Sequence, residues 1–128
     1  MRSSRSAVLA FGVLLGLACF GCNGSNKNPT APGSGADVVV HITPNSQNAA
    51  FLAYSPDTVD VKVGQTVEWI NDDNMAHTAT ETPTANFDTG QIAAGSSKTL
   101  TITGATGIRN YKCTINGHTM YGALNVTP

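Results

Sequence analysis

Six side chains of residues 36–128 are suited to hold a soft metal ion. They are the imidazoles, thiol and thioethers of His41, Met75, His77, Cys113, His118 and Met120. His118 and Met120 follow Cys113 by five and seven residues, within one short glycine-containing segment. His77 lies 36 residues before Cys113, directly after a run of turn-forming residues. Sulfur and imidazole are ligands that both copper and zinc accept, so the spacing raises the possibility of a bound transition metal.

Cys113 is the one cysteine that follows residue 22. In an exported protein, which the leader described below indicates, cysteines are usually paired, and an unpaired thiol is open to oxidation. A metal ion would hold the sulfur as thiolate and occupy its lone pairs. The alternative is a buried, inert cysteine that acts as a small apolar side chain. Cys113 by itself leaves both interpretations open.

Residues 36–128 show the pattern of many short strands. Apolar residues, often alternating with polar ones, recur at 36–43, 51–54, 59–63, 67–69, 77–82, 97–103, 109–113 and 123–127, between segments rich in turn formers. Seven or eight short strands in about 90 residues predict an all-β fold, a Greek-key sandwich of two sheets. Loops at one end of such a sandwich would give the candidate ligands a rigid support.

The distribution of charge argues against nucleic-acid binding. Two of the 7 Lys and Arg residues lie within the first five positions, which leaves five basic against eight acidic residues after residue 22 and a net charge of −3 there. A mildly acidic domain without a basic stripe is a poor ligand for nucleic acid. The sequence also offers no Ser-His-Asp set and no pair of carboxylates, so we expect no enzymatic turnover.

Residues 1–22 have the pattern of an export signal. Two arginines precede an apolar run over residues 7–18, which has the length of a signal's apolar region and is shorter than the roughly 20 residues that span a bilayer. Cys19 and Cys22 each follow a small residue. Such an ending resembles the bacterial lipobox, whose cysteine is lipidated. We favour Cys22, which polar residues follow; the alternative is a cleaved signal with incidental cysteines.

The residues between this leader and the first strand predict a tether. Residues 23–35 are rich in Gly, Ser, Pro and Asn, a composition typical of flexible linkers. The predicted organisation is therefore a lipoprotein-type signal peptide (1–22), a linker (23–35) and one domain (36–128). A diacylated cysteine supplies the two chains that stable membrane attachment requires. We expect a protein that is exported to the periplasm or cell surface and lipid-anchored to a bacterial membrane.

Five segments of the predicted domain follow one another in the order of a known family's motifs. They are Tyr54–Val59, Val63–Asn71, Phe87–Gly90 with Ala94–Ser96, Tyr111–Cys113 and Gly122–Val126. The series resembles the cupredoxins, the family of plastocyanin, azurin, amicyanin and pseudoazurin. That resemblance implies one copper ion, cycling between Cu(I) and Cu(II), held by His77, Cys113 and His118 with Met120 as axial ligand. A His₂Cys set with a weak axial thioether is the geometry of electron-transfer copper.

The segment after Cys113 combines two patterns of that family. Short-loop members carry the second histidine at the position of Asn116, whereas azurin-like members carry it at the position of His118 and have their methionine further on. Thr78 and Thr114 each directly follow a predicted ligand. We expect these two threonines to hydrogen-bond to one another or to the thiolate and so to lock the loops.

Three functions are compatible with this sequence. The predicted one is a membrane-tethered carrier of single electrons between redox protein partners, with copper as cofactor and His118 as the exit route. The second is a module that stores or delivers copper, and the third is a metal-free cupredoxin-like interaction domain. A zinc ion on the same Cys-His-His set would make the domain structural instead.

Overall fold

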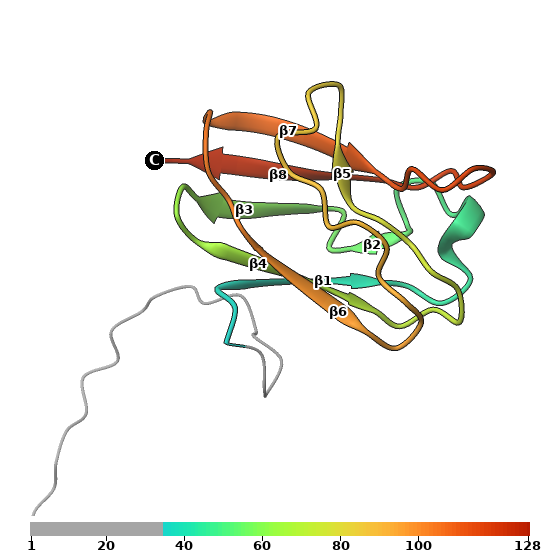
Figure 1. Cartoon of the computed structure of the whole chain (residues 1–128). Helices are drawn as coiled ribbons and strands as arrows, with labels where there is room; N and C mark the ends of the chain where they lie inside the picture. Colours follow the sequence, from blue (N-terminus) through green and yellow to red (C-terminus); the bar gives the residue numbers. More distant parts are fainter. Residues whose placement is uncertain (1–34) are drawn as a thin grey trace, which may run out of the picture.

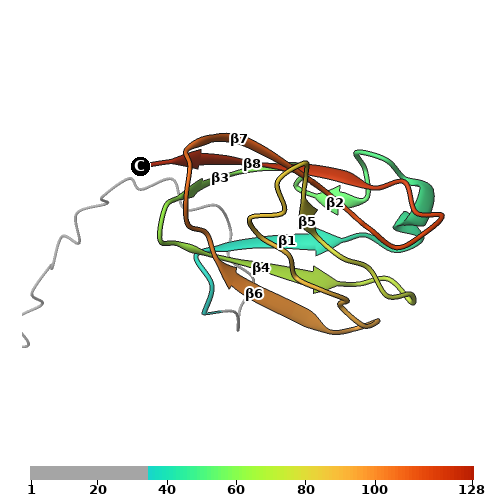
Figure 2. The ribbon, with the colours of Figure 1, turned by 45° about the horizontal axis from the view of Figure 1, so that its top comes forward.

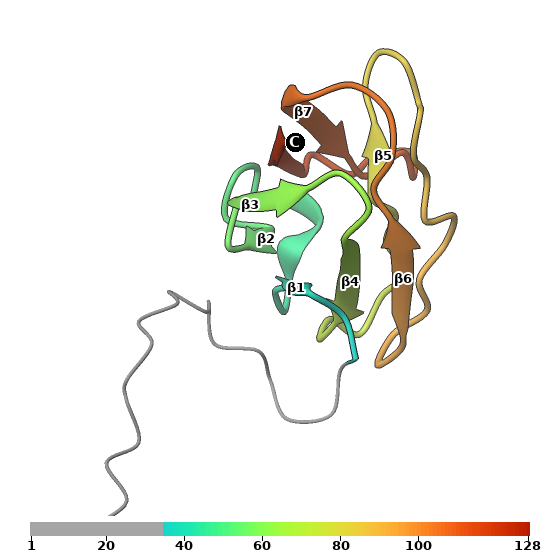
Figure 3. The same ribbon diagram turned by 90° about the vertical axis from the view of Figure 1, so that its left-hand side faces the viewer.

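The computed structural model describes residues 35–128, which form two four-stranded sheets packed face to face (Figure 1). The strand order is β2-β1-β4-β6 in one sheet and β3-β8-β7-β5 in the other. Figure 3 views the two layers from the end at which the C-terminus lies. The predicted all-β sandwich of two sheets is confirmed. The predicted signal, both of its cysteines and residues 23–34 of the linker lie outside the described residues.

Residues 35–128 form eight strands, at the upper end of the predicted range. They are β1 (Val38–Ile42), β2 (Tyr54–Ser55), β3 (Thr58–Lys62), β4 (Thr66–Asn71), β5 (Thr80–Glu81), β6 (Ser97–Thr101), β7 (Gly107–Lys112) and β8 (Tyr121–Thr127), and a 3-10 helix, η1 (Ser46–Asn48), follows β1. The strand predicted over 77–82 is shorter in the structure, because His77 pairs with Ile92 in an isolated bridge and only β5 joins a sheet.

The core lies between the sheets and follows from the alternation of the sequence. In β4, Val67 and Trp69 point inward and are fully buried, while the alternating residues Thr66, Glu68 and Ile70 are partly exposed. The Trp69 ring lies 5.8 Å from that of Tyr111, which comes from the opposite sheet. Burying an aliphatic or aromatic side chain contributes about 1.5–3 kcal/mol. The two sheets are therefore held together mainly by apolar contact, and form a firm support for their loops.

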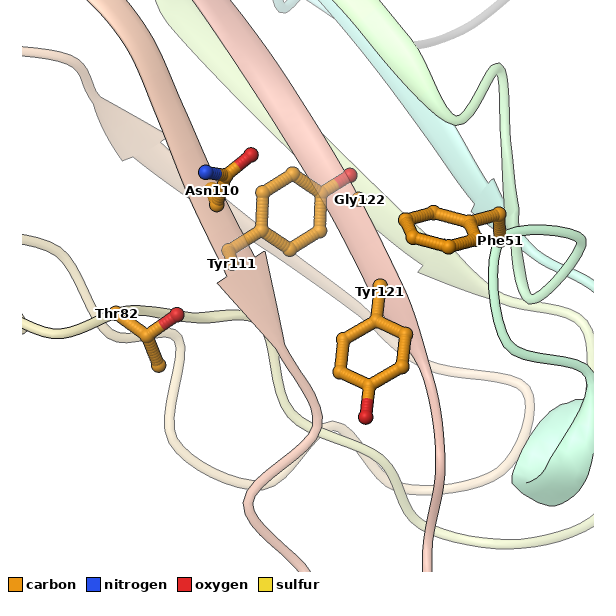
Figure 4. A pocket seen from close by; sticks show the side chains of 6 residues that line it. All are labelled: Phe51, Thr82, Asn110, Tyr111, Tyr121 and Gly122. Carbon is orange, nitrogen blue, oxygen red and sulfur yellow. The ribbon is translucent and has the colours of Figure 1, made fainter.

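Gly122 allows a close approach between two strands. It lies opposite Tyr111 in the β7–β8 pair, and a Cβ atom at this position would collide with the Tyr111 ring. Figure 4 shows that ring lying against the backbone at Gly122, beside the pocket that Phe51 and Tyr121 also line. The absence of a side chain at Gly122 thus lets the Tyr111 ring reach the core.

A buried ion pair joins β5 to β7. Arg109 Nε and Nη2 donate to the two carboxylate oxygens of Glu81, each at 2.8 Å, and the two side chains are only 7% and 6% exposed. Arg109 Nη1 also donates to the Thr103 carbonyl at 2.8 Å, and its guanidinium lies 5.3 Å from the centre of the Phe87 ring. Hydrogen bonding to Arg109 lowers the pKa of the Glu81 carboxyl, and Glu81 in turn raises the pKa of Arg109.

Three loops meet at the end of the sandwich opposite the C-terminus. They are the segment after β1 that contains η1, the β4–β5 connection and the β7–β8 loop, at the right of Figure 1 and again of Figure 2. The β4–β5 connection carries His77, and the β7–β8 loop carries Cys113 and His118. Within residues 35–128, no helix is long and apolar enough to cross a membrane.

Candidate metal centre

The structure brings three of the predicted ligands together at this end of the sandwich. His77 Nδ1 lies 3.2 Å from His118 Nδ1, and Cys113 Sγ lies 3.5 Å from His118 Nδ1. One ligand atom from each of the three residues falls within 4.8 Å of the others. Side chains separated by as many as 41 positions in the sequence therefore face one point.

The separations and donor types fit a single transition-metal ion. Imidazole nitrogen and thiolate sulfur bind such ions at about 2.0 and 2.3 Å. Two nitrogens that are 3.2 Å apart therefore leave room for one ion bonded to both. Two imidazoles and one thiolate are the donors that trigonal electron-transfer copper sites use. His77, Cys113 and His118 are the residues that would hold the ion.

Burial divides these three residues into two kinds. His77 is fully buried and Cys113 is 3% exposed, whereas His118 is partly exposed. The backbone N–H of Thr78 donates to Cys113 Sγ at 3.4 Å and so fixes the position of the sulfur. Two of the candidate ligands are thus shielded from water, and the third, His118, lies at the surface.

A pair of threonines ties the two ligand loops to each other. Thr78 Oγ1 lies 3.1 Å from Thr114 Oγ1 and accepts a hydrogen bond from the Thr114 backbone N–H at 2.9 Å. Thr80 Oγ1 donates to the same Thr78 oxygen at 3.2 Å. Because Thr78 follows His77 and Thr114 follows Cys113, these bonds hold the two loops in fixed relative positions.

Met120 lies beneath the loop, fully buried. Its carbonyl accepts a hydrogen bond from the Cys113 backbone N–H at 3.3 Å, which closes the loop upon itself. Its sulfur lies 4.0 Å from Ser46 Oγ, and that hydroxyl is 3.4 Å from His77 Nε2. Met120 is therefore part of the cluster around His77, and its role as axial ligand stays a prediction.

The other two candidate ligands lie on the surface. His41 Nδ1 pairs with Asp72 at 2.6 Å, and both side chains are more than 40% exposed. Met75 is 42% exposed, and its carbonyl accepts a hydrogen bond from Asn71 at 2.7 Å. His41 does not belong to the converging His-Cys-His group found among residues 35–128.

The sequence interpretation missed a buried carboxylate behind His77. Asp73 is 5% exposed, and its Oδ2 lies 2.7 Å from His77 Nε2. Burial acts to raise the pKa of Asp73, but hydrogen bonds from His77 and from backbone N–H groups outweigh it and hold the pKa below its ordinary value. Asp73 stands in a run of turn formers, and its spacing of four from His77 was the one available signal.

Comparison with known proteins gives a family match and three instructive structures. The family model of copper binding proteins of the plastocyanin/azurin family matches residues 40–127. A purple cupredoxin from Nitrosopumilus maritimus aligns with 70% of this chain and 99% of its own, at a TM-score of 0.61 and 21% identity. None of the curated proteins matches the chain in sequence.

The other two structures differ in how much of their own length is shared. An amicyanin variant in its reduced Cu(I) form aligns with 73% of this chain and 84% of its own, at a TM-score of 0.57 and 29% identity. A copper-containing nitrite reductase from Thermus scotoductus SA-01 aligns with 71% of this chain but only 22% of its own, at a TM-score of 0.55 and 23% identity. The match to the reductase is therefore a likeness of fold within a much longer chain.

Proposed function

The chain belongs to the plastocyanin/azurin family of copper-binding proteins, and on this premise we propose that it carries single electrons between protein partners. The family's metal is the copper that the sequence predicted. The observation that carries the proposal is that His77, Cys113 and His118 each place one ligand atom within 4.8 Å of the others. A copper ion held there would supply a one-electron Cu(I)/Cu(II) couple.

The surroundings of these ligands support rapid electron transfer. Cu(I) and Cu(II) prefer different coordination, so ligands that stay in place reduce the rearrangement that accompanies each electron. The Thr78–Thr114 contact of 3.1 Å ties the two ligand loops together, and the Cys113 N–H bond to the Met120 carbonyl closes one of them. We include Met120 as a weak axial ligand because the family resemblance implies it and because its side chain is buried where the Cys113 loop closes.

The partly exposed His118 is the proposed exit for the electron. His77 and Cys113 are buried, so His118 is the ligand that a partner reaches first. Its neighbours Ile115 and Gly117 present little charge, which suits brief docking to redox proteins. On this proposal the domain has no substrate turnover of its own, and any oxidase or reductase activity belongs to a partner.

The first experiment tests electron carriage on copper-loaded protein. Addition of copper(II) to the purified chain is expected to produce an intense visible absorption from the thiolate–copper bond. Voltammetry is expected to show a reversible one-electron couple, and a zinc-loaded sample serves as the control without a couple. A colourless copper(II) protein would contradict the proposal. Tight Cu(I) binding with an irreversible response would favour copper storage or delivery.

We also propose that the domain is tethered to a membrane through its N-terminal segment. In this organisation residues 1–22 are a lipoprotein-type signal peptide, residues 23–35 a linker and residues 36–128 the copper domain, placed in the periplasm or at the cell surface. Support comes from the leader's composition and from the small residue that precedes Cys22. Two acyl chains on that cysteine are sufficient for stable attachment.

The tether is tested by membrane fractionation of a bacterial host that expresses the full chain. The Cys22→Ser variant is expected to move from the membrane to the soluble exported fraction, because it has no acceptor for the lipid. The Cys19→Ser variant is the matched control and is expected to stay with the membrane, with a diacylglycerol mass on its N-terminal peptide. The opposite pattern would assign the lipid to Cys19, and a soluble parent chain would refute the anchor.

A further inference from the structure

We propose that Asp73 is a positioning residue that sets both the metal-binding nitrogen of His77 and the oxidation-state preference of the copper. The proposal rests on the copper function above. Asp73 does not belong to the converging ligand atoms. It touches His77 on the far side of the ring, where Oδ2 lies 2.7 Å from Nε2.

The hydrogen bonds around Asp73 determine which histidine nitrogen carries the proton. Oδ1 accepts from the backbone N–H groups of Asn45 at 3.0 Å and Asn74 at 2.7 Å. Oδ2 accepts from the Ser46 backbone N–H at 3.3 Å and from its hydroxyl at 3.4 Å. An ionised carboxylate can only accept, so His77 Nε2 must donate. The Nδ1 lone pair of His77 is then free to face Cys113 and His118.

The charge of Asp73 acts on the metal through the same contact. The carboxylate is 5% exposed, and its hydrogen-bond and ion-pair partners in the described part of the chain include no lysine or arginine. A buried charge is weakly screened, and one imidazole ring separates it from the ligand nitrogen. A negative charge stabilises Cu(II) more than Cu(I), so Asp73 lowers the reduction potential.

The Asp73→Asn variant removes the charge and reverses the hydrogen bond to His77. Its amide oxygen is expected to occupy the position of Oδ1, which faces two backbone donors, so its NH₂ group faces Nε2. His77 then accepts at Nε2 and carries its proton on Nδ1, where that proton competes with the metal. Loss of an outer partner of a metal-bound histidine typically lowers metal affinity by 10- to 100-fold, and we expect a loss in this range.

Two measurements read out these effects. Nitrogen-15 NMR of the metal-free protein is expected to show the Nε2–H tautomer of His77 in the parent chain and the Nδ1–H tautomer in Asp73→Asn. Voltammetry of the copper forms is expected to show a higher potential for the variant. A shift of the Cu(I)/Cu(II) ratio by about tenfold at a fixed potential corresponds to about 59 mV for one electron.

Asp72→Asn is the matched control. It makes the same change of charge one residue away, but its carboxylate is 45% exposed and pairs with His41. This variant is expected to keep the parent tautomer and potential. Equal reduction potentials in the parent and in Asp73→Asn would overturn the proposal. An Nδ1–H tautomer of His77 in the metal-free parent would also overturn it, and this second measurement does not require the variant to fold. The tautomer needs no copper, so failure of the parent's redox couple would refute the electron carrier alone.

Discussion

Replacing Cys113 with serine is expected to abolish the visible absorption of the copper(II)-loaded protein and to weaken copper binding by more than about a hundredfold. Loss of an outer partner of a metal ligand lowers metal affinity by up to about a hundredfold. The Cys113 thiolate is a proposed direct ligand, so its loss is expected to have a larger effect. The fold is expected to survive. Cys113 is 3% exposed, serine is smaller than cysteine, and its hydroxyl can accept the Thr78 N–H that now lies 3.4 Å from the sulfur.

The measurement is copper titration with absorption spectroscopy, together with circular dichroism to verify the fold. Asn116→Ala is the matched control, because Asn116 lies in the same loop and holds the position that carries the histidine of short-loop family members. The Asn116 variant is expected to keep both colour and affinity. If Cys113→Ser bound copper as tightly as the parent, the site would not be centred on this thiol, and a metal-free interaction domain would become the better interpretation.

Replacing Glu81 with alanine is expected to destabilise the domain by about 3–5 kcal/mol, the usual effect of breaking a buried ion pair. The change leaves the Arg109 guanidinium, 7% exposed, without its two bonds to the carboxylate. The parent pair is also sensitive to acid. Its stabilising effect is complete at pH values above the ordinary Glu pKa of 4.5, and it is lost as the pH falls through the lowered pKa of the folded state.

Denaturant unfolding of the metal-free protein measures this effect. Asp60→Ala is the control, since Asp60 is exposed and its carboxylate accepts a hydrogen bond from the Asn125 amide across the β3–β8 pair. A change within about 0.5 kcal/mol is expected there. The double variant Glu81→Leu with Arg109→Met is expected to recover much of the loss, because apolar pairs often replace buried ion pairs without penalty. A loss below about 1 kcal/mol for Glu81→Ala would contradict the prediction.

The sequence predicted the fold and the candidate ligands to different extents. Alternation such as that of Val67 and Trp69 is a local signal, and it predicted the sandwich because one face of each strand must be buried. Residue chemistry with the family resemblance identified His77, Cys113 and His118, which the structure brings together. The ends of short strands such as β5 were less predictable, since an isolated bridge between His77 and Ile92 is a tertiary feature.

Asp73 and Ser46 show what sequence patterns leave out. Asp73 stands among turn formers, and nothing in that local run distinguishes it from the exposed Asp72. Its partners Asn45 and Ser46 come from a loop 27 or more positions away. The contact between them depends on the parallel pairing of β1 with β4, which brings the two loops to the same end. Such a partner becomes visible only once strand order is known.

The parallel pairing of β3 with β8 has a consequence for how the chain is made. It joins residues 58–62 to residues 123–127, and the β7–β8 loop that holds Cys113 and His118 is bracketed by this last strand. Contacts between such distant segments form late and slow the folding reaction. The sandwich therefore cannot close until β8 has been synthesised and released. The β7–β8 loop is held at both ends only after that, so the three candidate ligands converge in a late step of folding.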